Sequence, residues 1–365
     1  MARNAKPTLK DVALLAGCGI ATASRVLNDS GPVSVDVRDK VERAARRLGF
    51  VFSATGRALQ SSRSMTVGCL VPSLVNPVFA EAVQGVQGEL AGFGYQLLIA
   101  SSNYDGAADD EAIRTFLSNG VDGLIATTVA PERSKALPLA GARGVPVSLM
   151  FHDSIDGFVT ARVDNFEAAR EVARQFAAHG HHRTGFLALR FASSDRSRNR
   201  YAGFHAECRA IGLADPILME LSEREANAPE RLAALLNDYP AQTAIFSSND
   251  FLAIAVQKAA RLLGRHVPND LSVVGFDGIE IGRLLEVPLA TIETRPEAIG
   301  RQAARTLLTA LQGGALVEPP ALPFSFRSGA TLGHLAVKGR KRGRSAARSS
   351  SPASSRTDHP ARKRP

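Results

Sequence analysis

The stretch TLKDVALLAGCGIATASRVL, residues 8–27, contains the signals of two short helices joined by a tight turn. Thr8 is a suitable N-cap for the first helix. Apolar residues then recur at helical spacing on one face, at Leu9, Val12, Ala13 and Ala16. Gly17 and Gly19 permit the sharp backbone turn that leads into a second helix over residues 20–28. The pattern therefore predicts two helices that pack against each other across the turn.

A third helix is predicted from about residue 34. Its inward positions repeat at helical spacing, at Val37, Val41, Ala44, Ala45 and Leu48. Its outward face is basic, with Arg38, Lys40, Arg43, Arg46 and Arg47. The second helix opens with small residues, so its backbone can approach a duplex and its hydroxyls can reach phosphates. These features predict a helix-turn-helix DNA-binding bundle, although three short helices with basic faces would also suit a small solvated bundle.

The charge of the chain is unevenly distributed. The chain of 365 residues carries a net charge of +9, of which residues 1–64 contribute +6 and residues 338–365 contribute +9, so the middle carries about −6. Basic ends of this kind are typical of polyanion binding. The basic tail has almost no apolar residue larger than alanine, so we expect it to be disordered. It is expected to add sequence-independent affinity for DNA, and a solvated tail without a role is the alternative.

Composition also limits the class of protein. Hydrophobic residues make up 45% of the chain, which is ample for packed cores. We find no apolar run long enough to span a membrane, and MARNAKPTLK lacks the apolar stretch of a secretion signal. The cysteines Cys18, Cys69 and Cys208 are widely spaced, which favours reduced thiols over a disulfide framework or a zinc site. We therefore expect a cytoplasmic protein with no contact to a membrane.

Short apolar runs alternate with amphipathic segments between residues 66 and 327. TVGCLV, YQLLIA, DGLIAT and VPVSLM are predicted to be buried strands, and the same rhythm resumes with GFLAL, TAIFSS and LSVVGF. Alternation of strand and helix predicts parallel sheets covered on both faces, and two successive runs predict two lobes. Ligands of such folds bind in the cleft at the carboxyl ends of the strands.

Many motifs, in order, resemble those of one family. TLKDVALLAG, ATASRVLND, GPVS and DKVERAARRLGF are similar to the DNA-binding domain of the lactose-repressor (LacI/GalR) family of bacterial transcription regulators. NPVFAEAVQGV, NGVDGLIA, RVDN, RYAGF, SSND, VPNDLSVVGFD and LPFSFRSGATLG resemble its effector-binding domain. The resemblance covers roughly residues 8–334.

The resemblance implies a fold and a division of the chain. It implies a small all-α helix-turn-helix domain followed by an α/β, two-lobed, periplasmic-binding-protein-like (type I) effector domain with parallel sheets. The expected boundaries are a DNA-binding domain over residues 1–52, a hinge over 53–64, an effector-binding and dimerisation domain over 65–335, and a disordered basic tail over 336–365.

For DNA, the resemblance implies base readers at Ile20, Ala21 and Arg25 and phosphate contacts from Thr22, Ser24 and Asn28. Among the base readers, Arg25 alone has a fork that can bond a guanine edge, and its alternative role is a phosphate clamp. The hinge would place Leu59 as a minor-groove wedge beside Arg57. Gly56 weakens a helix there, so we expect the hinge to order on DNA only, and an ordinary polar linker is the alternative.

For the effector, the resemblance implies a site at Phe79, Thr127, Phe151, Arg200, Asn249 and Asp277. Four of these residues have an alternative structural role. Phe79 could be a core aromatic and Arg200 could form a surface ion pair. Asn249 could cap a helix and Asp277 could accept hydrogen bonds within a loop. Phe151 stands where sugar-binding members tend to have a carboxylate, and His152 lies beside it. The effector is therefore expected to be a sugar or a sugar acid, with an acidic or ring-bearing molecule as the alternative.

The remaining motifs do not predict catalysis. HGHHR, residues 179–183, brings three imidazoles together, but a zinc site needs further ligands and cations suit the carboxyl end of a helix. The sequence has no nucleophile elbow, P-loop or zinc-protease motif. We therefore predict no enzyme, no cofactor and no metal. The prediction is a homodimeric repressor on a near-palindromic double-stranded operator, controlled by a small effector; a sugar-binding receptor without a regulatory role is the alternative.

Overall fold

The computed structural model describes residues 7–29, 31–50, 63–222, 225 and 228–335. The predicted hinge residues Arg57 and Leu59 and the basic tail lie outside the described residues.

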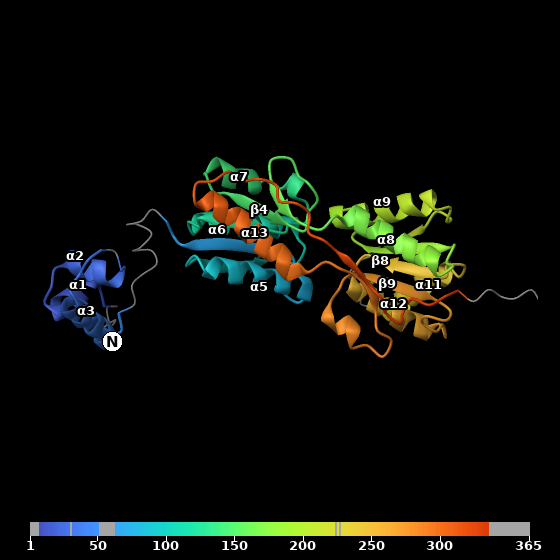
Figure 1. Ribbon diagram of the computed structural model, residues 1–365, viewed down its shortest axis with the longest axis horizontal. Coiled ribbons are helices and arrows are strands. Elements are labelled where there is room, and N and C mark those ends of the chain that lie inside the picture. Colours follow the sequence, from blue (N-terminus) through green and yellow to red (C-terminus); the bar gives the residue numbers. More distant parts are fainter. Residues whose placement is uncertain (1–6, 30, 51–62, 223–224, 226–227, 336–365) are drawn as a thin grey trace, which may run out of the picture.

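The amino-terminal helices form the predicted bundle. They are α1 (Leu9–Ala16), α2 (Ile20–Leu27) and α3 (Val35–Leu48), and their shared core contains Val12, Ala13, Ala23, Val26, Val41, Ala44 and Ala45 (Figure 1). Thr8 caps α1 through a capping box, in which its backbone N–H donates to Asp11 Oδ2 over 2.8 Å. Gly17 ends α1 at φ +67°, a left-handed conformation that glycine adopts without strain, and so the turn forms where the sequence predicts it.

The first lobe of the described chain is built on a parallel sheet with the order β2-β1-β3-β4-β5. Its strands are β1 (Thr66–Val71), β2 (Gln96–Ser101), β3 (Gly123–Ala126), β4 (Val147–Met150) and β5 (Val159–Ala161). Its own helices are α5 (Pro77–Ala91), α6 (Gly106–Ser118) and α7 (Leu137–Ala142), with a 3₁₀ turn at Pro131–Arg133. The prediction that YQLLIA forms a buried strand is wrong in one respect: β2 is an edge strand, and Leu98 and Ile99 are exposed at 37% and 40%.

The second lobe has the strand order β11-β10-β9-β8-β6-β7. Its strands are β6 (Thr184–Leu189), β7 (Ile217–Leu221), β8 (Ala244–Ser247), β9 (Ser272–Asp277), β10 (Ala290–Glu293) and β11 (Ser325–Arg327). Its helices are α8 (Asn165–Ala178), α9 (Asp195–Ala210), α11 (Pro229–Asp238) and α12 (Asp250–Leu262), with a 3₁₀ turn at Glu280–Arg283. The predicted parallel sheets are confirmed, and the second sheet adds one antiparallel edge strand, because β11 pairs antiparallel to β10.

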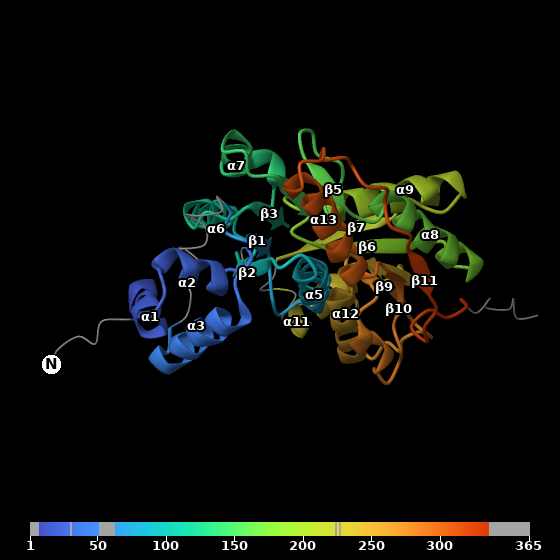
Figure 2. The same ribbon diagram turned by 60° about the vertical axis from the view of Figure 1, so that its left-hand side comes forward.

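The two lobes are not two successive runs of the chain. Helix α13 (Pro296–Leu311) follows β10 of the second lobe but packs along α5 of the first, and Figure 2 shows it there. The contact is close because Gly85 faces the Glu297 carbonyl and Gly300 faces the Ala82 carbonyl, where a Cβ would collide. Within residues 63–335 the backbone therefore passes between the lobes after β5, after β10 and before β11.

Candidate ligand cleft and nucleic-acid interface

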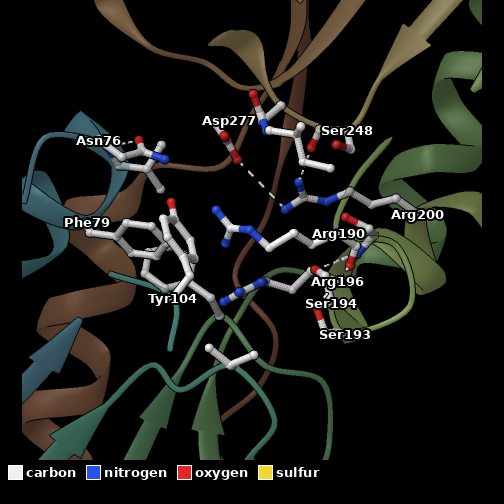
Figure 3. Close-up of a pocket in the computed structure, with 16 residues that line it drawn as sticks. Asn76, Phe79, Tyr104, Arg190, Ser193, Ser194, Arg196, Arg200, Ser248 and Asp277 are labelled. Carbon is white, nitrogen blue, oxygen red and sulfur yellow. Dashed lines mark hydrogen bonds and ion pairs between the residues drawn. The ribbon is translucent and has the colours of Figure 1, made fainter. Parts of the chain in front are cut away.

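A pocket lies between the lobes at the carboxyl ends of their strands. It holds about 770 Å³ of space, part of it open to solvent. The first lobe lines it with Asn76, Val78, Phe79, Tyr104, Val129 and Phe151. The second lobe lines it with Leu189, Arg190, Ser193, Ser194, Arg196, Ser197, Arg200, Ser248, Asn249 and Asp277 (Figure 3). Its size and mixed lining suit a small polar ligand with an apolar face.

The first lobe contributes an aromatic wall. The Phe79 ring meets Phe151 edge to face at 5.4 Å between centroids and Tyr104 at 6.3 Å. Phe79 and Phe151 are buried, and both line the pocket. Phe79 therefore has both of the roles considered from the sequence, since it packs in the core and also lines the cleft. The Asn76 side chain fixes the start of α5 by accepting from the Val78 N–H at 3.1 Å. This wall can stack against the apolar face of a ring or polyol.

Arg200 is a buried cation held from several sides. Its Nε donates to Asn165 Oδ1 over 2.9 Å, its Nη1 donates to the Ser248 carbonyl, and its guanidinium stands 3.5 Å above the centre of the Phe276 ring. Asp277 Oδ1 lies 3.7 Å from its Nη2. Burial lowers the pKa of Arg200 to about 10, against the opposing charge of Asp277, so it remains charged at neutral pH. The alternative of a surface ion pair is wrong for Arg200.

Asp277 and Asn249 reach the pocket from the ends of β9 and β8. Burial raises the pKa of Asp277 to about 6, and the neighbouring charge of Arg200 opposes this rise. Asn249 also caps α12, since its Oδ1 accepts from the Leu252 N–H at 2.8 Å. Both candidates therefore line the cleft, and Asn249 has its structural role as well.

Asp250 was not among the predicted site residues, and it holds the loop that carries Asp277. Asp250 is fully buried; its Oδ2 accepts from the Gly278 and Ile279 N–H groups at 2.8 Å each, and its Oδ1 accepts from Thr291 Oγ1 at 2.6 Å. Asp277 itself has a φ of +116°, so this loop is held in an unusual conformation. The place of Asp250 directly after Asn249 in the motif SSND could have indicated this role.

Two further pocket residues, Arg190 and Arg196, were not predicted. Arg190 follows β6, and its guanidinium lies 3.6 Å from the centre of the Tyr104 ring of the other lobe. Arg196 is the second residue of α9, one turn before Arg200. Among the described residues that line the pocket, arginine occurs three times and a carboxylate once, at Asp277. The cleft is therefore cationic.

Thr127 and His152 do not line the cleft. Thr127 is fully buried and donates its hydroxyl to the Met150 carbonyl at 3.2 Å, so its expected place in the site is corrected to the interior of the first lobe. His152 is also fully buried, and its Nδ1 lies 2.9 Å from Asp195 Oδ2. Because the Thr128 N–H donates to His152 Nε2 over 3.1 Å, the ring proton is assigned to Nδ1, which donates to Asp195.

The bond between His152 and Asp195 joins the two lobes. His152 belongs to the first lobe, whereas Asp195 opens α9 of the second. The Asp153 N–H also donates to Asp195 Oδ2 at 3.4 Å, and Asn199 donates to Asp153. Burial alone would raise the pKa of Asp195, but the bond from His152 and the charge of Arg196 outweigh burial and hold that pKa well below its usual range. Asp195 is therefore an ionised acceptor between the lobes.

The exposed face of α2 is the candidate nucleic-acid interface. Ile20 is exposed at 50%, Ala21 and Arg25 are exposed, and Thr22 is partly exposed. Ser24 departs from the expected phosphate contacts: it is buried at 8% exposure, and its Oγ accepts from Asn28 Nδ2 at 3.3 Å. The correction follows from helical spacing, because Ser24 stands beside the inward Ala23.

The histidine cluster shows ordinary contacts. His181 is buried between Thr243 Oγ1, at 3.0 Å from its Nδ1, and the Gly333 carbonyl, at 2.9 Å from its Nε2. The part of the chain that the structure describes contains no group of His, Cys, Asp or Glu side chains placed to hold a metal ion. Among the helices of the described residues, none combines the length and apolar character needed to cross a bilayer.

Comparison with known proteins gives matches for the amino-terminal helices and for the two-lobed domain. Residues 8–53 match a family described as bacterial regulatory proteins, lacI family, and residues 173–328 match a periplasmic binding protein-like domain. The chain is 32% identical to the HTH-type transcriptional regulator GntR of Escherichia coli K12, over 88% of this chain and 96% of the relative. It is 30% identical to the ribose operon repressor of Bacillus subtilis 168, over 85% of this chain and 94% of that repressor.

Solved structures agree with the fold. The lac repressor dimer bound to operator and the anti-inducer ONPF aligns with a TM-score of 0.80 at 26% identity, covering 91% of this chain and all of that chain. A LacI-family regulator from Silicibacter pomeroyi aligns with a TM-score of 0.77 at 28% identity, over 90% and 99%. The similarity therefore extends over both the helical bundle and the two lobes.

Proposed function

Because the chain belongs to the LacI family of bacterial regulatory proteins, we propose that it is an operator-binding repressor whose affinity for DNA changes when a small polar effector occupies the cleft. The observation that carries the proposal is the joint presence of an exposed α2 face and a polar pocket between two lobes. The relatives of this chain are transcriptional regulators and not enzymes.

The DNA contact is proposed for α2, with Arg25 as the main base reader. Ile20 and Ala21 would supply apolar contacts in the major groove, and Thr22 and Asn28 would reach phosphates. Arg57 and Leu59 keep their proposed hinge roles, outside the described residues. Recognition of a near-palindromic site needs a homodimer, and the exposed apolar edge of β2 supports one, as does the dimer of the lac repressor structure.

The effector is proposed to be a sugar or a sugar acid. Phe79 and Phe151 would pack on its apolar face, and Asn249 and Asp277 would bond its hydroxyls. Arg200 would orient these groups from its fixed position. The ribose operon repressor among the relatives is consistent with this class of ligand. An effector changes DNA affinity only through its preference for one arrangement of the lobes, so linkage applies in both directions.

Two variants of the full chain test the two halves separately. Footprinting on promoter fragments should show one symmetric protected site, which Arg25→Ala weakens while leaving effector binding unchanged. Thermal-shift screening with sugars and sugar acids should identify a stabilising ligand, whose effect Asp277→Asn removes while leaving the footprint of the unliganded protein. Absence of a symmetric footprint would refute the repressor assignment, and a footprint insensitive to every stabilising ligand would refute effector control.

A further inference from the structure

Residues with an unusual backbone conformation gather around the pocket. Among the described residues other than glycine, eight have a positive φ, and four of these line the pocket: Tyr104 at +60°, Phe151 at +68°, Arg190 at +49° and Asp277 at +116°. Large side chains rarely occur in this conformation, which persists where the surrounding structure holds it and is typical of ligand clamps and switches. Two of the four, Tyr104 and Arg190, meet across the cleft from different lobes.

Tyr104 is held by a tight turn of the first lobe. The two central residues of the turn, Asn103 and Tyr104, both have a positive φ, and the Asp105 N–H closes it by donating to the Ser102 carbonyl at 3.1 Å. Asp105 then caps α6, so the turn runs directly into a helix. The Tyr104 ring also packs edge to face with Phe79. The position of this ring is therefore set by contacts within the first lobe.

Arg190 is held by the second lobe, at the end of β6. Its backbone N–H donates to the Leu221 carbonyl of β7 at 3.4 Å. Its carbonyl accepts from the N–H groups of Ser193 and Ser194 at 3.1 and 3.0 Å. Figure 3 shows the Arg190 side chain extending from this lobe across the pocket to the aromatic wall. The backbone of Arg190 is therefore fixed to one lobe, and its guanidinium lies against the other.

The contact between these two side chains is a cation–π interaction. The guanidinium carbon of Arg190 lies 3.6 Å from the centre of the Tyr104 ring. Both residues are half-buried, and such contacts are stronger where water is excluded. Burial lowers the pKa of Arg190, and the adjacent Tyr104 opposes this fall. Because each lobe supplies one partner, opening the cleft on this side must break the contact.

We infer that Arg190 and Tyr104 form a latch that keeps the lobes together in the protein without effector. The Arg190–Tyr104 latch is preformed, because each lobe fixes the backbone of its own partner. Losing it should shift the equilibrium between closed and open lobes toward the open form by about 2- to 30-fold, the range of a cation–π contact. Tyr104 also packs on Phe79, so an effector on the aromatic wall would lie beside the latch. That last step rests on the proposed function, whereas the latch itself does not.

Distances between the lobes in the full chain without effector test the latch. Ser118→Cys on α6 and Asn237→Cys on α11 place one spin label in each lobe, because both positions are exposed. Cys69 and Cys208 are fully buried, so Cys18→Ser removes the remaining native thiol. An excess of unlabelled chain suppresses distances between protomers, and pulsed electron paramagnetic resonance gives the distance distribution.

The unaltered latch should give one narrow distance. Arg190→Gln and Tyr104→Leu should each add a second distance from open lobes, whereas Tyr104→Phe keeps the ring face and should not. Because the bond from His152 to Asp195 also joins the lobes, each variant is measured alone and together with His152→Gln. In the His152→Gln background the ratio of open to closed lobes should rise about 2- to 30-fold when the latch is removed.

Arg209→Gln is the matched control, because Arg209 lies at the far end of α9 and pairs with Asp215 of the same lobe. It should leave the distances unchanged, and thermal midpoints should show that each variant folds. Unchanged distances for Arg190→Gln and Tyr104→Leu in both backgrounds, or equal effects of Tyr104→Phe and Tyr104→Leu, would overturn the latch. The measurement uses neither effector nor DNA, so such a result would leave the repressor assignment to the footprint. Conversely, a confirmed latch without any symmetric footprint would refute the repressor alone.

Discussion

Replacing His152 tests whether the bond between the lobes controls effector affinity. His152 Nε2 accepts from the Thr128 N–H within the first lobe at 3.1 Å, whereas Nδ1 donates to Asp195 of the second lobe at 2.9 Å. A glutamine amide can occupy the position of Nε2, and an asparagine amide can occupy that of Nδ1. His152→Gln should therefore keep the contact within the lobe and lose the contact between lobes, and His152→Asn should do the reverse.

The size of the effect follows from the charge and burial of the bond. His152 is fully buried and Asp195 is ionised, so the bond belongs to the class that contributes about 1.5–3 kcal/mol. If an effector binds only when the lobes are together, losing the bond weakens binding by at most this amount, or about 10- to 150-fold. The glutamine variant should show this loss, and the asparagine variant should retain most of the affinity.

The assay is calorimetric titration of both full-length variants with a stabilising effector, at pH 8. Because the folded pKa of Asp195 lies below its unfolded value, the contribution of its carboxylate is present above the unfolded pKa and is lost only in stronger acid. The difference between the variants is therefore compared at pH 8, where the Asp195 carboxylate is ionised. Equal affinities for the two variants, or weaker binding by the asparagine variant, would refute the role of the bond.

Further expectations concern the bundle and the buried carboxylates. Arg25→Ala should reduce discrimination against altered half-sites by about 1–3 kcal/mol in competition binding, whereas Arg43→Ala on α3 should change only overall affinity; unchanged discrimination would contradict base reading. Thr8→Ala should lower the stability of α1 by about 1 kcal/mol, seen as faster amide exchange in the full chain. Burial and Asp277 raise the pKa of Asp250 from 3.8 to about 7, so the wild type loses stability as pH rises through this window. In urea titrations the loss of unfolding free energy caused by Asp250→Asn should therefore be smaller at pH 8 than at pH 5. A larger loss at pH 8 would contradict the raised pKa of Asp250.

Local sequence signals were sufficient to predict those elements that depend on neighbouring residues alone. The caps and glycines of residues 8–28 define the first two helices, because capping and turn formation depend on neighbouring residues only. The same holds for Asn249 and Asp277, since a polar residue at the carboxyl end of a buried strand lies at the edge where ligands bind. These two positions line the pocket, where strand ends place them.

Predictions failed where a residue's surroundings come from distant parts of the chain. The exposure of β2 depends on its having a strand neighbour on one side only, which its apolar pattern cannot reveal. The return of α13 to the first lobe depends on the facing glycines Gly85 and Gly300, which are 215 positions apart. The burial of Thr127 also depends on a distant residue, because its hydroxyl donates to the Met150 carbonyl of the next strand.

Of the two pocket arginines that were not predicted, Arg196 could have been found from its spacing. Arg196 and Arg200 are four residues apart in RSRNRYAGF, which puts both on one face of a helix. Asp195, the residue before Arg196, holds the first lobe through His152 while its other oxygen faces Arg196. Asp195 and Arg196 both belong to the first turn of α9, so a ligand contact at Arg196 would lie next to the group that joins the lobes. We therefore predict that a ligand contact at this turn is coupled to the arrangement of the lobes through adjacent residues.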